Sequence, residues 1–167
     1  MLSIANLQYS DIAEIVGACA AEGWNKPASQ YEHYLEEQDA KERDVLVARR
    51  ASVFAGYVTV RWRSDYPPFA ERDIPEIQDF NVMPPFRRRH IGTALMDEAE
   101  RRILARSPVI GIGVGLHHDY GAAQRLYVLR GYVPDARGIT SHGRRVNWGD
   151  DAKIDDDLVL WLTKAVS

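Results

Sequence analysis

The sequence predicts a single α/β domain, residues 1–167, in which a mixed β-sheet carries helices on both faces. The length of 167 residues fits one domain, and a composition of 46% hydrophobic and 27% charged residues is that of an ordinary globular protein. Runs rich in β-branched residues and segments with helical spacing of apolar residues succeed one another along the chain. Because the early strands form hairpins and the later ones alternate with helices, we expect both parallel and antiparallel neighbours in the sheet.

The expected elements follow the order strand, two helices, three strands, helix, strand, helix, two strands. Strands are expected at 2–8, 44–49, 53–63, 77–83, 108–116, 131–134 and 157–164. Helices are expected at 11–22, at 30–42, at 91–106 and from a cap at Asp119 to Arg130.

Local signals place several boundaries of these elements. Ser10 is expected to cap the first helix, and Ser29 with Glu32 forms a capping-box pattern for the second. The segment 64–75 holds three prolines and is predicted to be a loop. The residues from 135 to 156 are polar and are predicted to lie outside the sheet.

Composition excludes several classes of protein. No apolar run approaches the 18 residues or so of a membrane span, and the N-terminus shows no secretory pattern. The single cysteine, Cys19, falls on the apolar face of the first helix, which favours a buried thiol and a reducing cytoplasm. A net charge of −3 argues against a dedicated nucleic-acid binder that would use Arg87, Arg88 and Arg89.

The turn between the strand at 77–83 and the helix at 91–106 is the segment richest in chemistry. A helix N-terminus leaves backbone N–H groups unpaired and carries partial positive charge. The three arginines at 87–89 add cationic groups, and Gly92 allows a ligand close to the backbone. These features predict a pyrophosphate site; the alternative is a solvated basic turn before an ordinary core helix.

Two motifs in this half of the chain resemble those of the GNAT (Gcn5-related) N-acetyltransferases. Arg87-Arg88-Arg89-His90-Ile91-Gly92, preceded by Val82-Met83-Pro84, is similar to the acetyl-CoA-binding motif Q/R-x-x-G-x-G/A. The segment from Tyr120 to Tyr127, followed by Gly131-Tyr132, is similar to N-x-x-A-x-x-L-Y and the G-F or G-Y after it. The sequence departs from these motifs at His90, where a side chain narrows the phosphate site, and at Tyr120, which replaces asparagine.

The resemblance implies a fold and a cofactor. The fold is a mostly antiparallel, twisted sheet of six to seven strands, in which the two central parallel strands, 77–83 and 108–116, splay apart. The cofactor is acetyl-CoA, used as a co-substrate. The residues implied to hold it are Phe80, Val82, Arg87, Arg88, Arg89, His90, Ile91, Gly92, Thr93 and Tyr120.

The resemblance also implies an acetyltransferase in which a primary amine attacks the thioester directly. The backbone N–H of Val82 stabilises the developing charge on the thioester oxygen, and Tyr127 is the general acid that protonates the leaving thiolate. Either Glu76 or Asp79 is expected to help remove a proton from the amine. The amine acceptor is a small molecule or a peptide, and a homodimer is possible.

Other functional interpretations of the same residues remain open. A non-catalytic module that binds or senses acyl-CoA would account for the departures at His90 and Tyr120. Trp24, Tyr31 and Tyr34 line an acceptor pocket or belong to the core. No metal site is expected, because His117 and His118 would point to opposite faces of a strand.

Overall fold

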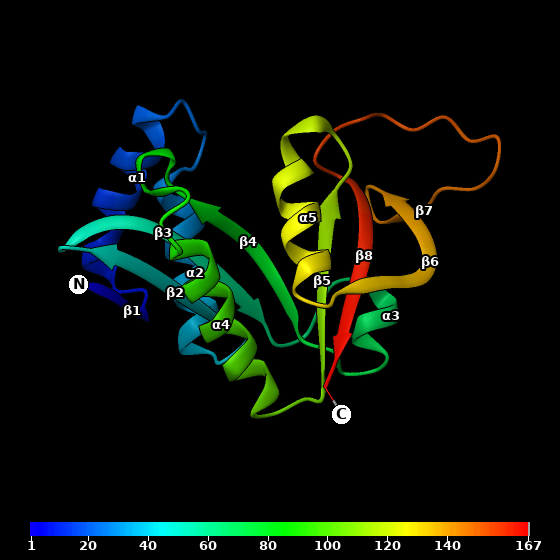
Figure 1. Ribbon diagram of the computed structural model, residues 1–167, viewed down its shortest axis with the longest axis horizontal. Helices are drawn as coiled ribbons and strands as arrows, with labels where there is room; N and C mark the ends of the chain where they lie inside the picture. Colours follow the sequence, from blue (N-terminus) through cyan, green and yellow to red (C-terminus); the bar gives the residue numbers. More distant parts are fainter. Residues whose placement is uncertain (167) are drawn as a thin grey trace.

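The computed structural model describes residues 1–166 and contains one eight-stranded sheet with the order β1-β2-β3-β4-β5-β8-β6-β7 (Figure 1). The strands are β1 (Leu2–Asn6), β2 (Arg43–Arg50), β3 (Val53–Arg61), β4 (Glu76–Val82), β5 (Val109–Gly115), β6 (Val133–Ser141), β7 (Arg144–Arg145) and β8 (Leu158–Ala165). The helices are α1 (Ile12–Ala21), α2 (Ala28–Asp39), α3 (Pro67–Ala70), α4 (Ile91–Leu104) and α5 (Gly121–Leu129). The expected mixed sheet is confirmed, with eight strands where six to seven were predicted.

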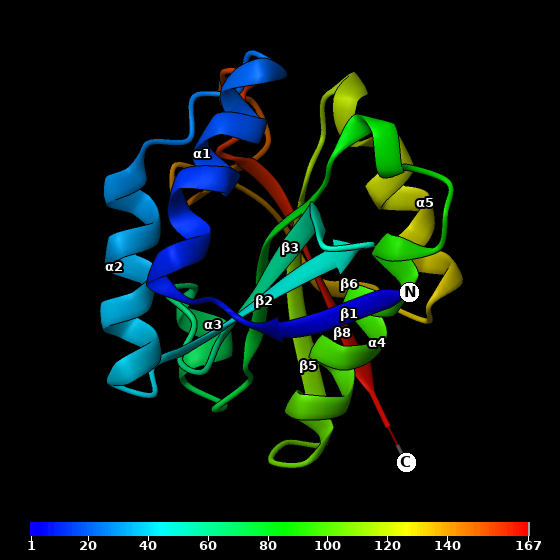
Figure 2. The ribbon, with the colours of Figure 1, turned by 90° about the vertical axis from the view of Figure 1, so that its left-hand side faces the viewer.

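The helices lie on both faces of the sheet because the strands alternate their apolar side chains. Val45 and Val47 of β2 pack with α1 and α2, whereas Leu46 and Ala48 pack on the opposite face with α4. Figure 2 shows α1 and α2 on one side of the sheet and α4 and α5 on the other. None of the helices within residues 1–166 is long and apolar enough to cross a membrane.

The two parallel neighbours, β4 and β5, are paired over a very short length. Only Glu76 with Gly111 and Ile77 with Ile112 are in register, and beyond these pairs the strands diverge (Figure 1). All other neighbouring strands are antiparallel. The divergence opens the sheet at the carboxyl ends of β4 and β5.

A β-bulge in β4 lies just beyond the last of these pairs. Gln78 pairs with Thr59 of β3 and Asn81 with Tyr57, so two residues of β4, at positions 79 and 80, lie opposite Val58 alone. Asp79 has a φ of 47°, in the left-handed region. A bulge of this kind bends the strand and increases its local twist.

Several predicted boundaries are wrong. A 3-10 turn at Tyr9–Asp11 precedes α1, so Ser10 is not its cap, and α2 already begins at Ala28, which places Ser29 inside the helix. Another 3-10 turn, His118–Tyr120, precedes α5, and Asp119 donates its backbone N–H to His117 instead of capping the helix. The proline-rich loop contains α3, and the polar segment contributes most of β6 and all of β7.

Candidate active site

The opening between β4 and β5 leads into a cleft of about 1180 Å³. The cleft is lined by residues of β4, β5 and β8, by the start of α4, by α5, and by the α1–α2 connection. The three residues predicted to be catalytic, Glu76, Asp79 and Tyr127, all line it. Eight of the ten residues predicted to hold acetyl-CoA also line it: Phe80, Val82, Arg87, Arg88, His90, Gly92, Thr93 and Tyr120.

The remaining two predicted cofactor residues do not line the cleft. The side chain of Ile91 is 1% exposed and packs in the core beneath α4. Arg89 is exposed to solvent beside the cleft. The contribution of Ile91 to a ligand is therefore limited to its backbone.

The start of α4 presents free backbone donors to the cleft. Among residues 1–166, no backbone acceptor pairs with the N–H groups of residues 88–93. Arg88 and His90 have φ angles of 57° and 62°, which turn this stretch of backbone into a left-handed loop. Adjacent N–H groups in such a loop, at a helix N-terminus, form a concave site for an anion.

The start of α4 packs closely against β4. A Cβ at Gly92 would lie 3.0 Å from Cζ of Phe80 and 3.4 Å from Cγ2 of Val82, so glycine allows α4 to approach β4 closely. Arg87 turns back toward the strand, where its Nε donates to the carbonyl of Val82 at 3.2 Å. Its guanidinium lies 6.0 Å from the ring centroid of Trp24.

The backbone of β4 supplies a donor to the interior of the cleft. The N–H of Met83 donates to Ala55 of β3 at 2.9 Å. Because successive N–H groups of a strand point to opposite edges, the N–H of Val82 points away from β3 and toward the opening. It is therefore available to a ligand that enters the opening between β4 and β5.

Tyr127 extends from α5 onto the sheet. Its side chain packs against the main core and is 5% exposed. The residue also lines the cleft. Burial raises the pKa of its phenol, and nearby Tyr120 adds to the effect. The phenol therefore stays protonated at neutral pH, as a general acid must.

Glu76 lies at the first position of β4, at the closed end of the opening. It is 4% exposed and accepts a hydrogen bond from the hydroxyl of Ser64. Burial raises the pKa of this carboxyl, against the opposing hydrogen bonds from Ser64 and Gln78. A carboxylate with a raised pKa is a more effective proton acceptor near neutral pH.

Asp79 lies only three residues away but in a different environment. Burial alone would raise the pKa of its carboxyl, but Lys26, at 2.6 Å, together with hydrogen bonds from Tyr57 and Tyr34, holds it below the usual range. The two candidate bases therefore have pKa values shifted in opposite directions.

A cluster of three side chains at the mouth of the cleft was not predicted. Asp156 accepts hydrogen bonds from the hydroxyl of Tyr120 at 3.0 Å and from Nε2 of His117 at 2.9 Å. The rings of His117 and Tyr120 meet edge to face at 4.7 Å. The cluster fastens the segment before β8 to the end of β5, and burial with the Asp156 bond raises the pKa of Tyr120 to about 12.

The aromatic residues expected near the acceptor divide between two roles. Trp24 lines the cleft, together with Lys26 and with Trp161 of β8, which sequence reasoning did not single out. Tyr31 is fully buried in the core under α1 and α2. Tyr34 lies behind the lining and donates to Asp79.

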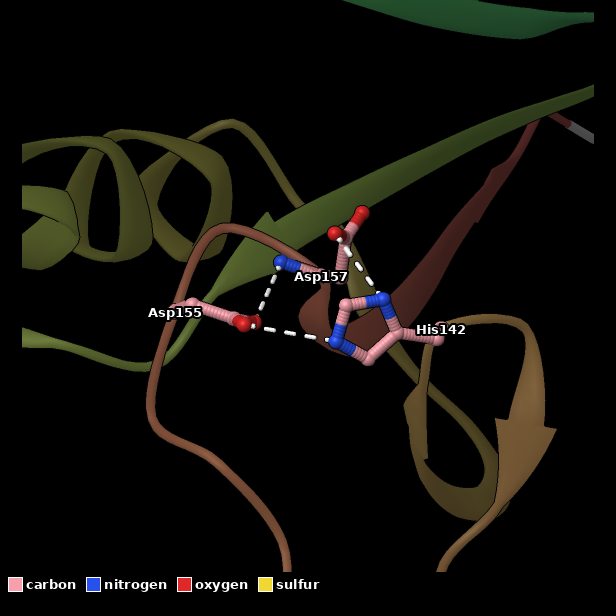
Figure 3. A group of neighbouring side chains, drawn as sticks. All are labelled: His142, Asp155 and Asp157. Carbon is pink, nitrogen blue, oxygen red and sulfur yellow. Dashed lines mark hydrogen bonds and ion pairs between the residues drawn. The ribbon is translucent and has the colours of Figure 1, made fainter.

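One group of metal-ligating side chains occurs in the described part of the chain, at His142, Asp155 and Asp157 (Figure 3). Nε2 of His142 lies 3.3 Å from Asp155 and Nδ1 lies 3.2 Å from Asp157. Both ring nitrogens already face carboxylates, so polar contacts between the imidazole and the two aspartates account for the group. It lies outside the cleft lining.

A splayed parallel strand pair, a run of free N–H groups at a helix start and a buried phenol in one cleft define an acyltransferase that uses an acyl-CoA. The chain belongs to the GNAT acetyltransferases: the model of the "Acetyltransferase (GNAT) family" matches residues 9–132. It is an acyltransferase, and its co-substrate is acetyl-CoA. The free N–H groups of residues 88–93 and the volume of the cleft fit this molecule.

Solved structures of low sequence identity share the fold. A GNAT-family protein from Desulfovibrio desulfuricans aligns over 100% of both chains with 14% identity and a TM-score of 0.74. An N-acetyltransferase from Staphylococcus aureus Mu50 covers 99% of this chain and 98% of its own, with 14% identity and a TM-score of 0.73. The protein yncA from Salmonella typhimurium, solved with its cofactor acetyl-CoA, covers 99% and 94%, with 16% identity and a TM-score of 0.70. No curated protein sequence matches the chain.

Proposed function

We propose that the protein transfers the acetyl group of acetyl-CoA to a primary amine by direct attack, without an acyl-enzyme. The observation that carries the proposal is the single cleft that joins the free N–H groups at the start of α4 to the buried phenol of Tyr127. The acceptor is a small-molecule or peptide amine. A homodimer and a cytoplasmic setting belong to the same proposal; the lone, buried Cys19 is in keeping with a reducing compartment.

The chain's own residues supply each part of the reaction. The backbone N–H groups of residues 88–93 bind the pyrophosphate, with Arg88 beside them. The N–H of Val82 donates to the thioester oxygen as it gains charge. Glu76 accepts the proton that the attacking ammonium must lose, and Tyr127 donates a proton to the departing sulfur. Two protons leave the nitrogen on its way from ammonium to amide: Glu76 accepts the first, and the second is lost from the nitrogen of the tetrahedral intermediate. One of them replaces, through solvent, the proton that Tyr127 gives to the sulfur, and the other is released to solvent, which closes the cycle.

Substitution of the phenol tests this assignment. Tyr127→Phe keeps the packing of the ring and removes the acidic proton, so we expect kcat to fall about 10- to 1000-fold. Acetyl-CoA affinity, measured by calorimetry with ATP as a control for nonspecific phosphate binding, is expected to stay within about twofold because the phosphate contacts are untouched. An unchanged kcat would remove Tyr127 from the role of acid.

Binding without turnover would support the other candidate, a module that binds or senses acyl-CoA. The left-handed conformation of His90, at a position lining the cleft, is the observation in its favour. A panel of amines followed by thiol release separates the two functions. Micromolar acetyl-CoA binding with no thiol release from any amine would favour the sensor.

A further inference from the structure

The carboxylate of Asp79 accepts so many hydrogen bonds that it keeps no free lone pair for a proton. Lys26 donates to Oδ1 at 2.6 Å, and Asn81 donates to the same oxygen at 2.8 Å. Oδ2 receives the hydroxyl of Tyr57 at 2.6 Å, together with the Tyr34 hydroxyl and the Gln30 amide, both at 3.0 Å. A carboxylate offers about four lone-pair sites, so five donors occupy all of them.

The donors come from separate parts of the fold. Lys26 belongs to the α1–α2 connection, Gln30 and Tyr34 belong to α2, and Tyr57 belongs to β3. Asp79 therefore ties one wall of the cleft to the centre of the sheet. The network continues into the core, because Tyr31 donates to the hydroxyl of Tyr57 at 3.3 Å.

The carboxylate also sits at the point where the sheet opens. The last residue of β4 in register with β5 is Ile77. Asp79 follows two positions later and forms the bulge, with the left-handed φ of 47°. Aspartate tolerates this conformation because its short side chain can be held by hydrogen bonds. The N–H of Val82 lies three residues further along the same bent strand, so its direction depends on the bulge.

We propose that Asp79 is a positioning residue, whose five hydrogen bonds hold the β4 bulge and thereby fix the opening in which the acyl group is transferred. The proposal rests on the function proposed above, and assigns proton transfer to Glu76 alone. The bulge stays formed because the Asp79 carboxylate gathers donors from α2, β3 and the α1–α2 connection around it. Substituting the carboxylate lets β4 straighten and moves the N–H of Val82.

Three variants test the proposal. Asp79→Ala removes every acceptor, and we expect weaker acetyl-CoA binding with kcat lowered about 10- to 100-fold, the order of loss that follows misplacement of a reacting group. Asp79→Asn keeps the shape, one acceptor oxygen and the tolerance of positive φ, so it recovers most of both quantities. Glu100→Gln is the matched control, because Glu100 is also a buried carboxylate with several donors but lies away from the cleft.

The pH dependence separates positioning from proton transfer. The acidic limb of the kcat profile is expected to persist in both Asp79 variants and to flatten in Glu76→Gln. A limb that flattens in Asp79→Asn would make Asp79 the base and overturn the proposal. Unchanged acetyl-CoA affinity and kcat in Asp79→Ala would overturn it as well. If Asp79→Ala does not fold, Tyr34→Phe removes a single donor and is expected to shift acetyl-CoA affinity in the same direction.

A spectroscopic measurement keeps this inference apart from the proposed function. Backbone amide spectra of wild type and Asp79→Ala report the bulge without any substrate, and the signals of Phe80, Asn81 and Val82 are expected to move most, with smaller shifts in Asp79→Asn. Wild-type protein that does not bind acetyl-CoA would refute the proposed function while these shifts still test Asp79. Shifts spread evenly over the chain would refute the positioning role.

Discussion

The ring of Tyr120 occupies the space that a side chain at position 115 would need. A Cβ built on Gly115 would lie 2.8 Å from Cζ of Tyr120 and closer still to Cε2 and Cδ2. Gly115→Ala therefore forces the ring off the end of β5 and breaks its hydrogen bond to Asp156. Overpacking of this kind costs about 1–3 kcal/mol, and each kcal/mol lowers the Tm of a chain of this size by about 2–4 °C.

A double-mutant cycle assigns this cost to the ring. In Tyr120→Ala the ring is absent and Gly115→Ala meets no obstacle, so urea unfolding of the four proteins should show a coupling of about 1–3 kcal/mol. Gly121→Ala is the matched control: no heavy atom lies within 4 Å of a Cβ there, and the residue is in right-handed helical conformation at the start of α5. We expect it to be neutral or stabilising by up to about 1 kcal/mol.

Two results would contradict a steric clash between the Tyr120 ring and a side chain at position 115. If the two substitutions add within about 0.5 kcal/mol, the ring is not what makes alanine unfavourable at position 115. If Gly121→Ala destabilises as much as Gly115→Ala, the loss reflects the loop backbone rather than a steric contact. Either result would show that the contact with Gly115 and the hydrogen bond to Asp156 do not fix the ring of Tyr120 at the mouth of the cleft.

Two further substitutions probe the phosphate loop and the buried charges. His90→Gly removes a side chain that lines the cleft and relaxes a φ of 62°, so acetyl-CoA binding measured by calorimetry is expected to tighten several-fold; unchanged or weaker binding would show that the imidazole is not an obstacle. Glu100→Gln is expected to cost about 3 kcal/mol at pH 7 by urea unfolding, because it leaves Arg130 and Lys164 without a buried carboxylate. Burial opposes ionisation of Glu100, but these partners lower its pKa, so the contribution is complete above the ordinary value of 4.5 and is lost as the pH falls below it. A wild-type-to-variant difference that stays constant from pH 7 to pH 3 would contradict this.

Local patterns in the sequence predict most elements of the fold, β8 included, but not the helix caps, most of β6 or β7. The apolar run of β2 is visible because the strand is buried on both faces, and the apolar stripe of α4 is visible because the helix buries one face in the core. β6 gives no such signal: most of its residues are exposed or only partly buried on both faces, so nothing in its composition separates it from a loop. Ser10 and Ser29 have the right chemistry for caps, but a sequence pattern places a helix start only to within a residue or two. Ser10 falls inside the 3-10 turn before α1, and Ser29 falls inside α2.

The residues of the site also differ in how far the sequence predicts them, according to whether their partners are near or distant along the chain. The loop at 87–93, proposed to hold the pyrophosphate, could be predicted because that role depends on consecutive backbone groups. Lys26 and Asp156 could not, since their partners lie 53 and 36 residues away in the sequence. Asp156 in particular stands in a run of three aspartates that has the composition of a solvated turn. Its hydrogen bonds to His117 and Tyr120 exist only because β5 and β8 are neighbours.

Glu76 and Asp79 show why residue type and spacing do not assign a catalytic role. Both are acidic residues of one strand, and the sequence favours neither strongly. The fold gives Glu76 few donors and a buried position, which raises its pKa, while Asp79 receives five donors and a lowered pKa. A base needs a free lone pair, and a raised pKa brings a carboxyl closer to the working pH. The directions of the two pKa shifts and the number of donors therefore favour Glu76 over Asp79 for the proposed role of base. In the proposed function, the hydrogen bonds at Asp79 leave Glu76 as the carboxylate that accepts the proton, and these bonds come from α2 and β3, in contacts that no local pattern contains.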